Sequence, residues 1–250
     1  MTLAHDVTGS GRPVVLLHSS AADRRMWDPQ VDALVAAGHR VVRPDFRGFG
    51  DTPPAPAFSD AEDVRDLLDE LGVGPAAVVG ASFGGSVAQE FAARWPDRVT
   101  KLVLLCAGMR GAAETPDATA YRERKEKLVA ARDLDALVEL DTGTWLGPEA
   151  DERARAALRT MRRRSAEVAF ALDGTMDRRF ADVDLAAITA PTLVVSGAHD
   201  LDYFGAIAGV LAERVPNARH VTLPWAGHLP SVERPEEVSA LVVDFLHEGR

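Results

Sequence analysis

One short stretch constrains the fold of this chain more than any other: residues 76–85 read AAVVGASFGG. Its first half is an apolar run typical of a buried strand, and the residues after Ser82 follow a helical pattern. Gly80 and Gly84 stand two positions either side of the serine, where a sharp strand-to-helix turn leaves no room for side chains. Such a turn presents the Ser82 hydroxyl at a helix N-terminus, which favours negative charge. The stretch therefore predicts a nucleophilic serine; the competing interpretation is a glycine-rich connection without chemistry.

Apolar runs and helical patterns alternate on both sides of this stretch. Strands are predicted at residues 3–7, 13–17, 40–44, 76–80, 101–106, 191–197 and 219–223. Helices are predicted at residues 26–37, 60–71, 83–95, 203–215 and from 235 onward. Strand and helix in turn, with short links, are typical of an α/β fold whose mostly parallel sheet of about seven strands is flanked by helices. Residues 1–108 and 189–250 are therefore predicted to form one core.

The alternation stops between residues 109 and 188. No strong strand signal occurs there, and helical patterns lie at residues 121–131, 134–140 and 154–161. This segment is predicted to be an inserted helical cap, or lid, over the core. The charged runs at residues 122–127 and 162–164 are most simply the solvated faces of its helices. An arginine among them that points inward could instead meet a substrate carboxylate.

The composition narrows the possible partners and location. A net charge of −10 argues against a nucleic acid or an anionic membrane as partner. Cys106 is the single cysteine, which excludes an internal disulfide and favours a reducing compartment, and its place after an apolar run predicts a small buried side chain. No signal peptide or membrane-length apolar run is recognised, so we predict a cytoplasmic location. The sequence carries no metal or nucleotide signature, and no cofactor is expected.

Polar residues follow several predicted strands at the carboxyl edge, where open parallel sheets bind their ligands. They are His18 to Ser20, Ser82, His199 with Asp200, and Gly227 with His228. A serine hydroxyl needs a base to take its proton, and histidine is the usual base. We predict that His228 is this base, because it follows the last strand and keeps the chain order serine, acid, histidine. His18, a competitor, is expected to hydrogen-bond the backbone and hold its loop.

The base must be oriented by a carboxylate, and the loop after residue 197 offers two. Asp200 is nearer to the strand end and is our prediction, whereas Asp202 is expected to cap the next helix. Attack on an acyl carbon also requires N–H donors for the oxyanion. The residue after the nucleophile would supply the amide of Phe83, and the loop after residue 17 would supply that of Ser20.

Five motifs in chain order carry a resemblance to a known superfamily. They are LLH at residues 16–18, DFRGFG at 45–50, GASFGG at 80–85, SGAHD at 196–200 and GH at 227–228. Together they look like the α/β-hydrolase superfamily, and HSS at 18–20 with GHLP at 227–230 is similar to small bacterial serine esterases and 3-oxoadipate enol-lactonases. The resemblance implies Ser82 as nucleophile, His228 as base, Asp200 as acid and a helical cap over the pocket. Ser19 stands where the family usually has glycine, and the first of the family's eight strands is missing.

The function implied is hydrolysis of a small carboxylic ester or lactone through an acyl-enzyme on Ser82. Serine at this position argues against haloalkane dehalogenases and epoxide hydrolases, whose relatives use aspartate. A cofactor-free perhydrolase, a C–C bond hydrolase, a hydroxynitrile lyase or a ligand receptor on the same site stays open. Ser19, Trp145 and Phe170 are candidate pocket residues, although both aromatic side chains could equally belong to the core of the cap. The sequence predicts no oligomeric state.

Overall fold

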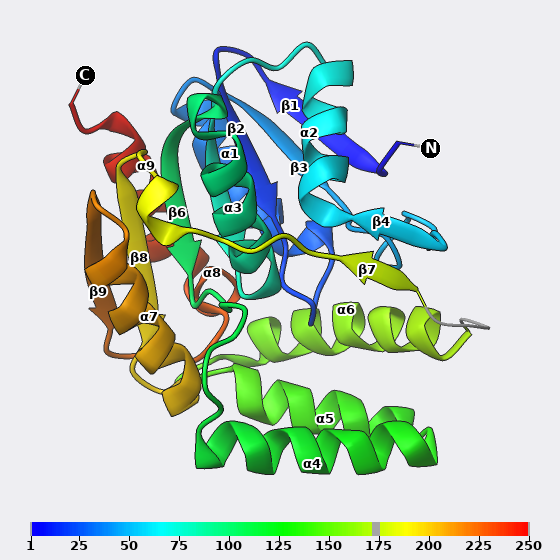
Figure 1. Cartoon of the computed structure of the whole chain (residues 1–250). Helices are drawn as coiled ribbons and strands as arrows, with labels where there is room; N and C mark the ends of the chain where they lie inside the picture. The colour runs from blue at the N-terminus through cyan, green and yellow to red at the C-terminus, as the bar shows by residue number, and fades with distance from the viewer. Residues whose placement is uncertain (1, 172–175, 250) are drawn as a thin grey trace.

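The structure is a computed structural model that describes residues 2–171 and 176–249 (Figure 1). Within these residues, seven strands form the main sheet in the order β1-β3-β2-β5-β6-β8-β9. Its neighbouring strands are parallel except for the antiparallel pair β1 and β3. The strands are β1 (His5–Gly9), β2 (Arg12–Leu17), β3 (His39–Pro44), β5 (Ala76–Ala81), β6 (Val99–Leu105), β8 (Thr192–Gly197) and β9 (Ala218–Leu223). The predicted mostly parallel α/β sheet is confirmed.

The central strands are buried on both faces, as their continuous apolar sequences require. Their register brings the carboxyl ends to one level: Leu17 pairs with Gly80, Ala81 with Leu105, and Leu105 with Val195. The loops that follow these strands therefore start side by side. This alignment places the polar residues after β2, β5 and β8 at one edge of the sheet.

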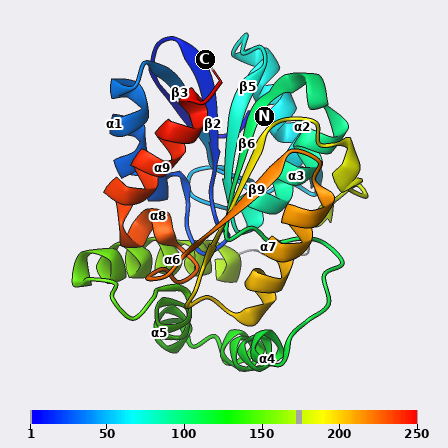
Figure 2. The ribbon, with the colours of Figure 1, turned by 90° about the vertical axis from the view of Figure 1, so that its left-hand side faces the viewer.

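Helices cover both faces of the sheet (Figure 2). One face carries α1 and α9, and the other carries α2, α3 and α7. Their bounds are α1 (Asp28–Ala36), α2 (Asp60–Glu70), α3 (Phe83–Arg94), α7 (Asp202–Arg214) and α9 (Pro235–His247). Shorter turns are the 3-10 helices at Arg24–Trp27, Pro96–Arg98 and Leu185–Ala187, together with α8 (Pro230–Glu233). The inward faces of these helices are apolar, for example Val238, Val242 and Phe245 of α9.

A layer of three helices lies beyond the carboxyl edge of the sheet, where Figure 1 shows it in green. It consists of α4 (Pro116–Ala131), α5 (Leu134–Trp145) and α6 (Glu152–Ala171), each longer than the helical pattern predicted for it. The expected solvation of the charged run 162–164 is wrong for Arg162, which is buried and forms an ion pair with Asp141. One residue of the run faces inward because α6 packs against α5. That residues 109–188 form a separate cap stays a prediction.

The structure also contains a two-stranded sheet that was not predicted from the sequence. It pairs β4 (Ala57–Ser59) in parallel with β7 (Asp177–Arg179), which lies in the segment without strand signal. The residues of β7 are all charged, so no apolar pattern marks it. Instead, the Arg178 guanidinium lies 4.8 Å from the centre of the Phe83 ring and 5.1 Å from that of Phe58. No helix within residues 2–171 or 176–249 is long and apolar enough to cross a membrane.

Candidate active site

Ser82 occupies a strained turn between β5 and α3. Its backbone angles are φ 51° and ψ −116°, a conformation that costs a non-glycine residue about 1–3 kcal/mol. A Cβ on Gly80 would lie 2.4 Å from the Gly84 carbonyl oxygen, and one on Gly84 would lie 2.2 Å from the Leu17 carbonyl oxygen. The two glycines are therefore required by the close passage of β2 and α3, as the motif predicts.

A continuous hydrogen-bonded chain joins Ser82, His228 and Asp200. The Ser82 Oγ is 2.8 Å from His228 Nε2, and His228 Nδ1 is 2.7 Å from Asp200 Oδ2. The other carboxylate oxygen of Asp200 accepts the Leu201 amide at 2.8 Å. Because a carboxylate only accepts, Nδ1 carries the proton, and Nε2 is left to accept from the serine hydroxyl. The side chains of His228 and Asp200 are 2% and 1% exposed, so the hydrogen bond between them is shielded from water.

Aromatic side chains pack on the His228 imidazole. The ring of Phe204 lies 4.0 Å away and that of Trp145 lies 4.6 Å away, between ring centres. The Trp145 carbonyl also accepts the His228 amide at 2.9 Å. The structure thus brings Trp145, a predicted pocket residue, directly to His228. Phe204 was not predicted, and its only sequence signal is its place on the apolar face of α7, four residues after Asp200.

The two amides predicted to bind the oxyanion, those of Phe83 and Ser20, belong to segments that adjoin Ser82 or the end of β2. Phe83 is the first residue of α3, so its N–H lies outside the hydrogen bonding of the helix. In the loop after β2, the Ser19 amide points to the Met26 sulfur at 3.3 Å, and Ser19 Oγ accepts the Ala21 amide at 3.2 Å. That the Phe83 and Ser20 amides hold the oxyanion stays a prediction. Ser19 shapes the loop through its bonds to Met26 and Ala21.

Three other residues considered in the sequence, His18, His199 and Asp202, lie near the carboxyl edge of the sheet but outside the Ser82–His228–Asp200 series. His18 is buried; its Nδ1 donates to the Ser19 carbonyl and its Nε2 accepts the Phe46 amide at 3.0 Å, as expected of a residue that holds the loop. Burial lowers the pKa of His18, which keeps this ring neutral. His199 is exposed. Asp202 is exposed and does not cap α7, because the N-cap position belongs to Leu201.

Phe170 is the one predicted pocket residue that the described contacts place elsewhere. It lies near the end of α6, where its ring is 5.0 Å from the Arg132 guanidinium and its carbonyl accepts from the same side chain at 2.6 Å. Neither contact involves the loops that carry Ser82 and His228. Its aromatic character was the only signal for a pocket, and that character here serves the joint between α4 and α6.

Cys106 adjoins this site. Within the described residues, potential metal-ligand atoms of Cys106, Asp200 and His228 lie within 4.8 Å of one another, close enough to bind one metal ion. However, Asp200 and His228 are each other's hydrogen-bond partners, and burial raises the pKa of the Cys106 thiol. Because the thiolate is the metal-binding form, this environment disfavours a metal. The thiol donates weakly to the Gly227 carbonyl at 3.6 Å.

Fold and site together define a class of protein. The chain belongs to the α/β hydrolase family, whose model matches residues 14–241. It is 32% identical over 271 residues to the putative non-heme bromoperoxidase BpoC of Mycobacterium tuberculosis, covering 98% of this chain and 97% of the relative. The enol-lactonase of Burkholderia xenovorans LB400 superposes with a TM-score of 0.80 at 29% identity, over 98% and 96% of the chains. A thermophilic esterase of Thermogutta terrifontis gives 0.79 at 29% identity, over 98% and 93%.

Proposed function

We propose that this protein is a serine hydrolase that cleaves a small carboxylic ester or lactone. The observation that carries the proposal is the buried hydrogen-bonded chain from Asp200 through His228 to Ser82. The esterase and enol-lactonase among the similar structures support the reaction class. A cytoplasmic location, and a small-molecule partner in place of a nucleic acid or membrane, belong to the same proposal.

The geometry suggests how each group acts. His228 Nε2 takes the Ser82 proton as Oγ attacks the acyl carbon, and Asp200 stabilises the imidazolium that forms. The Phe83 and Ser20 amides donate to the oxyanion of the tetrahedral intermediate. His228 then returns the proton to the leaving alkoxide, and the acyl group stays on Ser82. Water attacks this acyl-enzyme by the same route, which releases the acid and restores the serine.

The direct test is turnover of p-nitrophenyl esters of several chain lengths and of simple lactones by the wild type and by Ser82→Ala. We expect Ser82→Ala to lose at least about 10³-fold in kcat, because no other group can carry the acyl intermediate. Ser86→Ala is the matched control: it lies one turn later in α3 and lines a cavity with Gln89 and Arg110. Full activity in Ser82→Ala would refute the proposed mechanism.

Perhydrolysis is a second candidate, favoured by the relative described as a putative non-heme bromoperoxidase. Here hydrogen peroxide in place of water would attack the acyl group on Ser82. The products would be a peracid and free serine, with His228 taking the peroxide proton and returning it to Oγ. Wild type and Ser82→Ala mixed with acetate and hydrogen peroxide test this directly. Oxidation of bromide by the peracid, lost in Ser82→Ala, would support it.

A further inference from the structure

Glu233, at the end of α8, bridges two backbone segments through its carboxylate. Oε1 accepts the Gly227 amide at 2.9 Å, and Oε2 accepts the Gly147 amide at 2.9 Å. Gly227 directly precedes His228, and Gly147 follows Trp145 by two residues. The Glu233 side chain therefore ties the loop that carries the proposed base to the segment that packs on it.

The two segments cross in direct contact at this point. A Cβ on Gly227 would lie 2.5 Å from the Gly147 nitrogen, and one on Gly147 would lie 2.7 Å from Glu233 Oε2. The hydrogen bond from the His228 amide to the Trp145 carbonyl closes the crossing from the other side. Residues 145–147 and 227–228 are thus joined at both ends, and the Glu233 side chain hydrogen-bonds to both segments.

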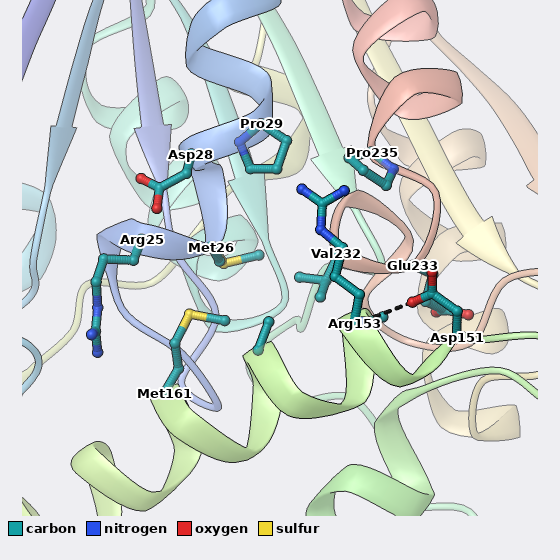
Figure 3. A pocket seen from close by; sticks show the side chains of 12 residues that line it. Arg25, Met26, Asp28, Pro29, Asp151, Arg153, Met161, Val232, Glu233 and Pro235 are labelled. Carbon is teal, nitrogen blue, oxygen red and sulfur yellow. Dashed lines mark hydrogen bonds between the residues drawn. The ribbon is translucent and has the colours of Figure 1, made fainter.

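Backbone amides, those of Gly147 and Gly227 first among them, stabilise the buried Glu233 carboxylate. Glu233 lines a cavity of about 210 Å³ whose other side chains are partly apolar, such as Met26 and Met161, and partly charged, such as Asp151 and Arg153 (Figure 3). Glu233 is only 8% exposed, and burial raises the pKa of its carboxyl group, helped by the charge of Asp200. Backbone hydrogen bonds from Gly147, Gly227 and Leu229 oppose this rise. A buried carboxyl group of this kind is costly unless its hydrogen bonds are made.

We propose that Glu233 is a positioning residue, which holds the His228 loop and Trp145 in the register that aims His228 Nε2 at Ser82. The inference rests on the proposed function of Ser82 and His228 and extends it to a residue that acts on them through the backbone of Gly147 and Gly227. A displacement of about 1 Å in a reacting group can cost on the order of a hundredfold in rate. Loosening this crossing should therefore slow the chemical step without removing any reacting group.

Glutamate is required here for a specific chemical reason. The Gly147 and Gly227 amides each donate to one carboxylate oxygen of Glu233, so both oxygens must act as acceptors. Glutamine has the same shape but carries one NH₂ group, which in either orientation would oppose a backbone N–H. Glu233→Gln is therefore a small change in volume and a large change in hydrogen bonding. The matched control is Glu237→Gln on α9, because Glu237 is exposed and forms an ion pair with Arg234 at 2.9 Å.

The experiment measures kcat and KM on a p-nitrophenyl ester, with active sites counted by fluorophosphonate labelling of Ser82 and intact mass. We expect Glu233→Gln to lower kcat per labelled site by about 10- to 100-fold, with KM within about twofold, because Glu233 contacts no substrate. Labelling of Ser82 should slow in parallel. Glu237→Gln should match the wild type in every measurement.

A purely structural role predicts a different result, in which Glu233→Gln has fewer active sites but an unchanged kcat per site. That result would overturn the inference, as would full wild-type kinetics. Gly147→Ala perturbs the same crossing from its other side, so its loss should be less than additive with that of Glu233→Gln. Additive losses would also count against the inference. A wild type that shows neither Ser82 labelling nor turnover overturns the proposed function, whereas failure in Glu233→Gln alone overturns only the role of Glu233.

Discussion

The His228 imidazole is held through its nitrogens, its backbone and its ring faces at once. Asp200 and Ser82 occupy the two ring nitrogens, the Trp145 carbonyl takes the amide, and Phe204 and Trp145 pack on the ring. Because the imidazole is already held in one orientation, proton transfer costs less conformational entropy. The hydrogen-bond partners follow from the sequence motifs. Of the aromatic neighbours, Trp145 was predicted as a pocket residue but not as a partner of His228, and Phe204 was not predicted, because no local pattern connects their helices to His228.

Cys106 provides a prediction at the same scale. It is 1% exposed, and burial raises the pKa of its thiol, so little reactive thiolate should be present in the folded protein. We expect Ellman's reagent to react with native Cys106 at least about 100-fold more slowly than with the unfolded chain. The measurement is thiol release at pH 8 with and without guanidinium chloride. Rapid labelling of the native protein, with loss of turnover, would mean that the thiol is accessible beside His228.

At the scale of elements, a buried polar cluster joins the helices beyond the sheet. Asp141 of α5 forms an ion pair with Arg162 of α6 and accepts the Tyr121 hydroxyl of α4 at 2.7 Å. The Tyr121 ring in turn packs on Trp145, one turn after Asp141, at 4.5 Å between centres. The cluster therefore sets the position of the aromatic ring that contacts His228. Burial and the Asp141 charge raise the pKa of Tyr121, which keeps its hydroxyl protonated as a donor.

Two ion pairs between α5 and α6 allow a matched test of this cluster. The pair of Asp141 with Arg162 is buried, whereas that of Asp135 with Arg163 is exposed. Asp141→Asn leaves a buried guanidinium without its counter-charge and should lower the free energy of unfolding by about 3 kcal/mol or more. Asp135→Asn should change it by less than about 0.5 kcal/mol. Urea unfolding measures the free energy of unfolding of each variant. Equal losses in the two variants would show that the burial of Arg162 does not make its ion pair more important for stability.

At the scale of the whole molecule, the sequence predicts what short-range patterns determine. Apolar runs, helical spacing and the glycine-flanked Ser82 predict the sheet, its helices and the residues at its carboxyl edge. The small sheet of β4 and β7 was missed because it is held by Arg178 over the rings of Phe58 and Phe83, which are distant in sequence. The burial of Arg162 was missed for the same reason. The bridge at Glu233 likewise depends on two glycines that only the folded chain brings together.

Asp60 is a further long-range feature, with consequences for the stability of the whole molecule. It is 2% exposed, and within residues 2–171 and 176–249 its carboxyl oxygens have no hydrogen-bond partner. Arg178 Nη1 lies 3.3 Å from Oδ2, and Asp63, Glu90 and Arg47 are the other charges that act on it. Burial outweighs the attraction to Arg178 and raises the pKa of Asp60 to about 7.

This shift predicts how stability depends on pH. The folded protein keeps the Asp60 proton up to about pH 7, whereas the unfolded chain releases it near the ordinary pKa of 3.8. Between these two pH values, folding is therefore accompanied by the uptake of a proton. The free energy of unfolding contributed by Asp60 must therefore fall as pH rises through this window. Between pH 5 and pH 8 the wild type should lose roughly 1–3 kcal/mol more than Asp60→Asn, which has no proton to release. Asp66→Asn, which removes an exposed carboxylate of the same helix, should keep the wild-type slope. Urea unfolding at several pH values measures the slopes, and parallel slopes for wild type and Asp60→Asn would mean that Asp60 is ionised in the folded protein throughout.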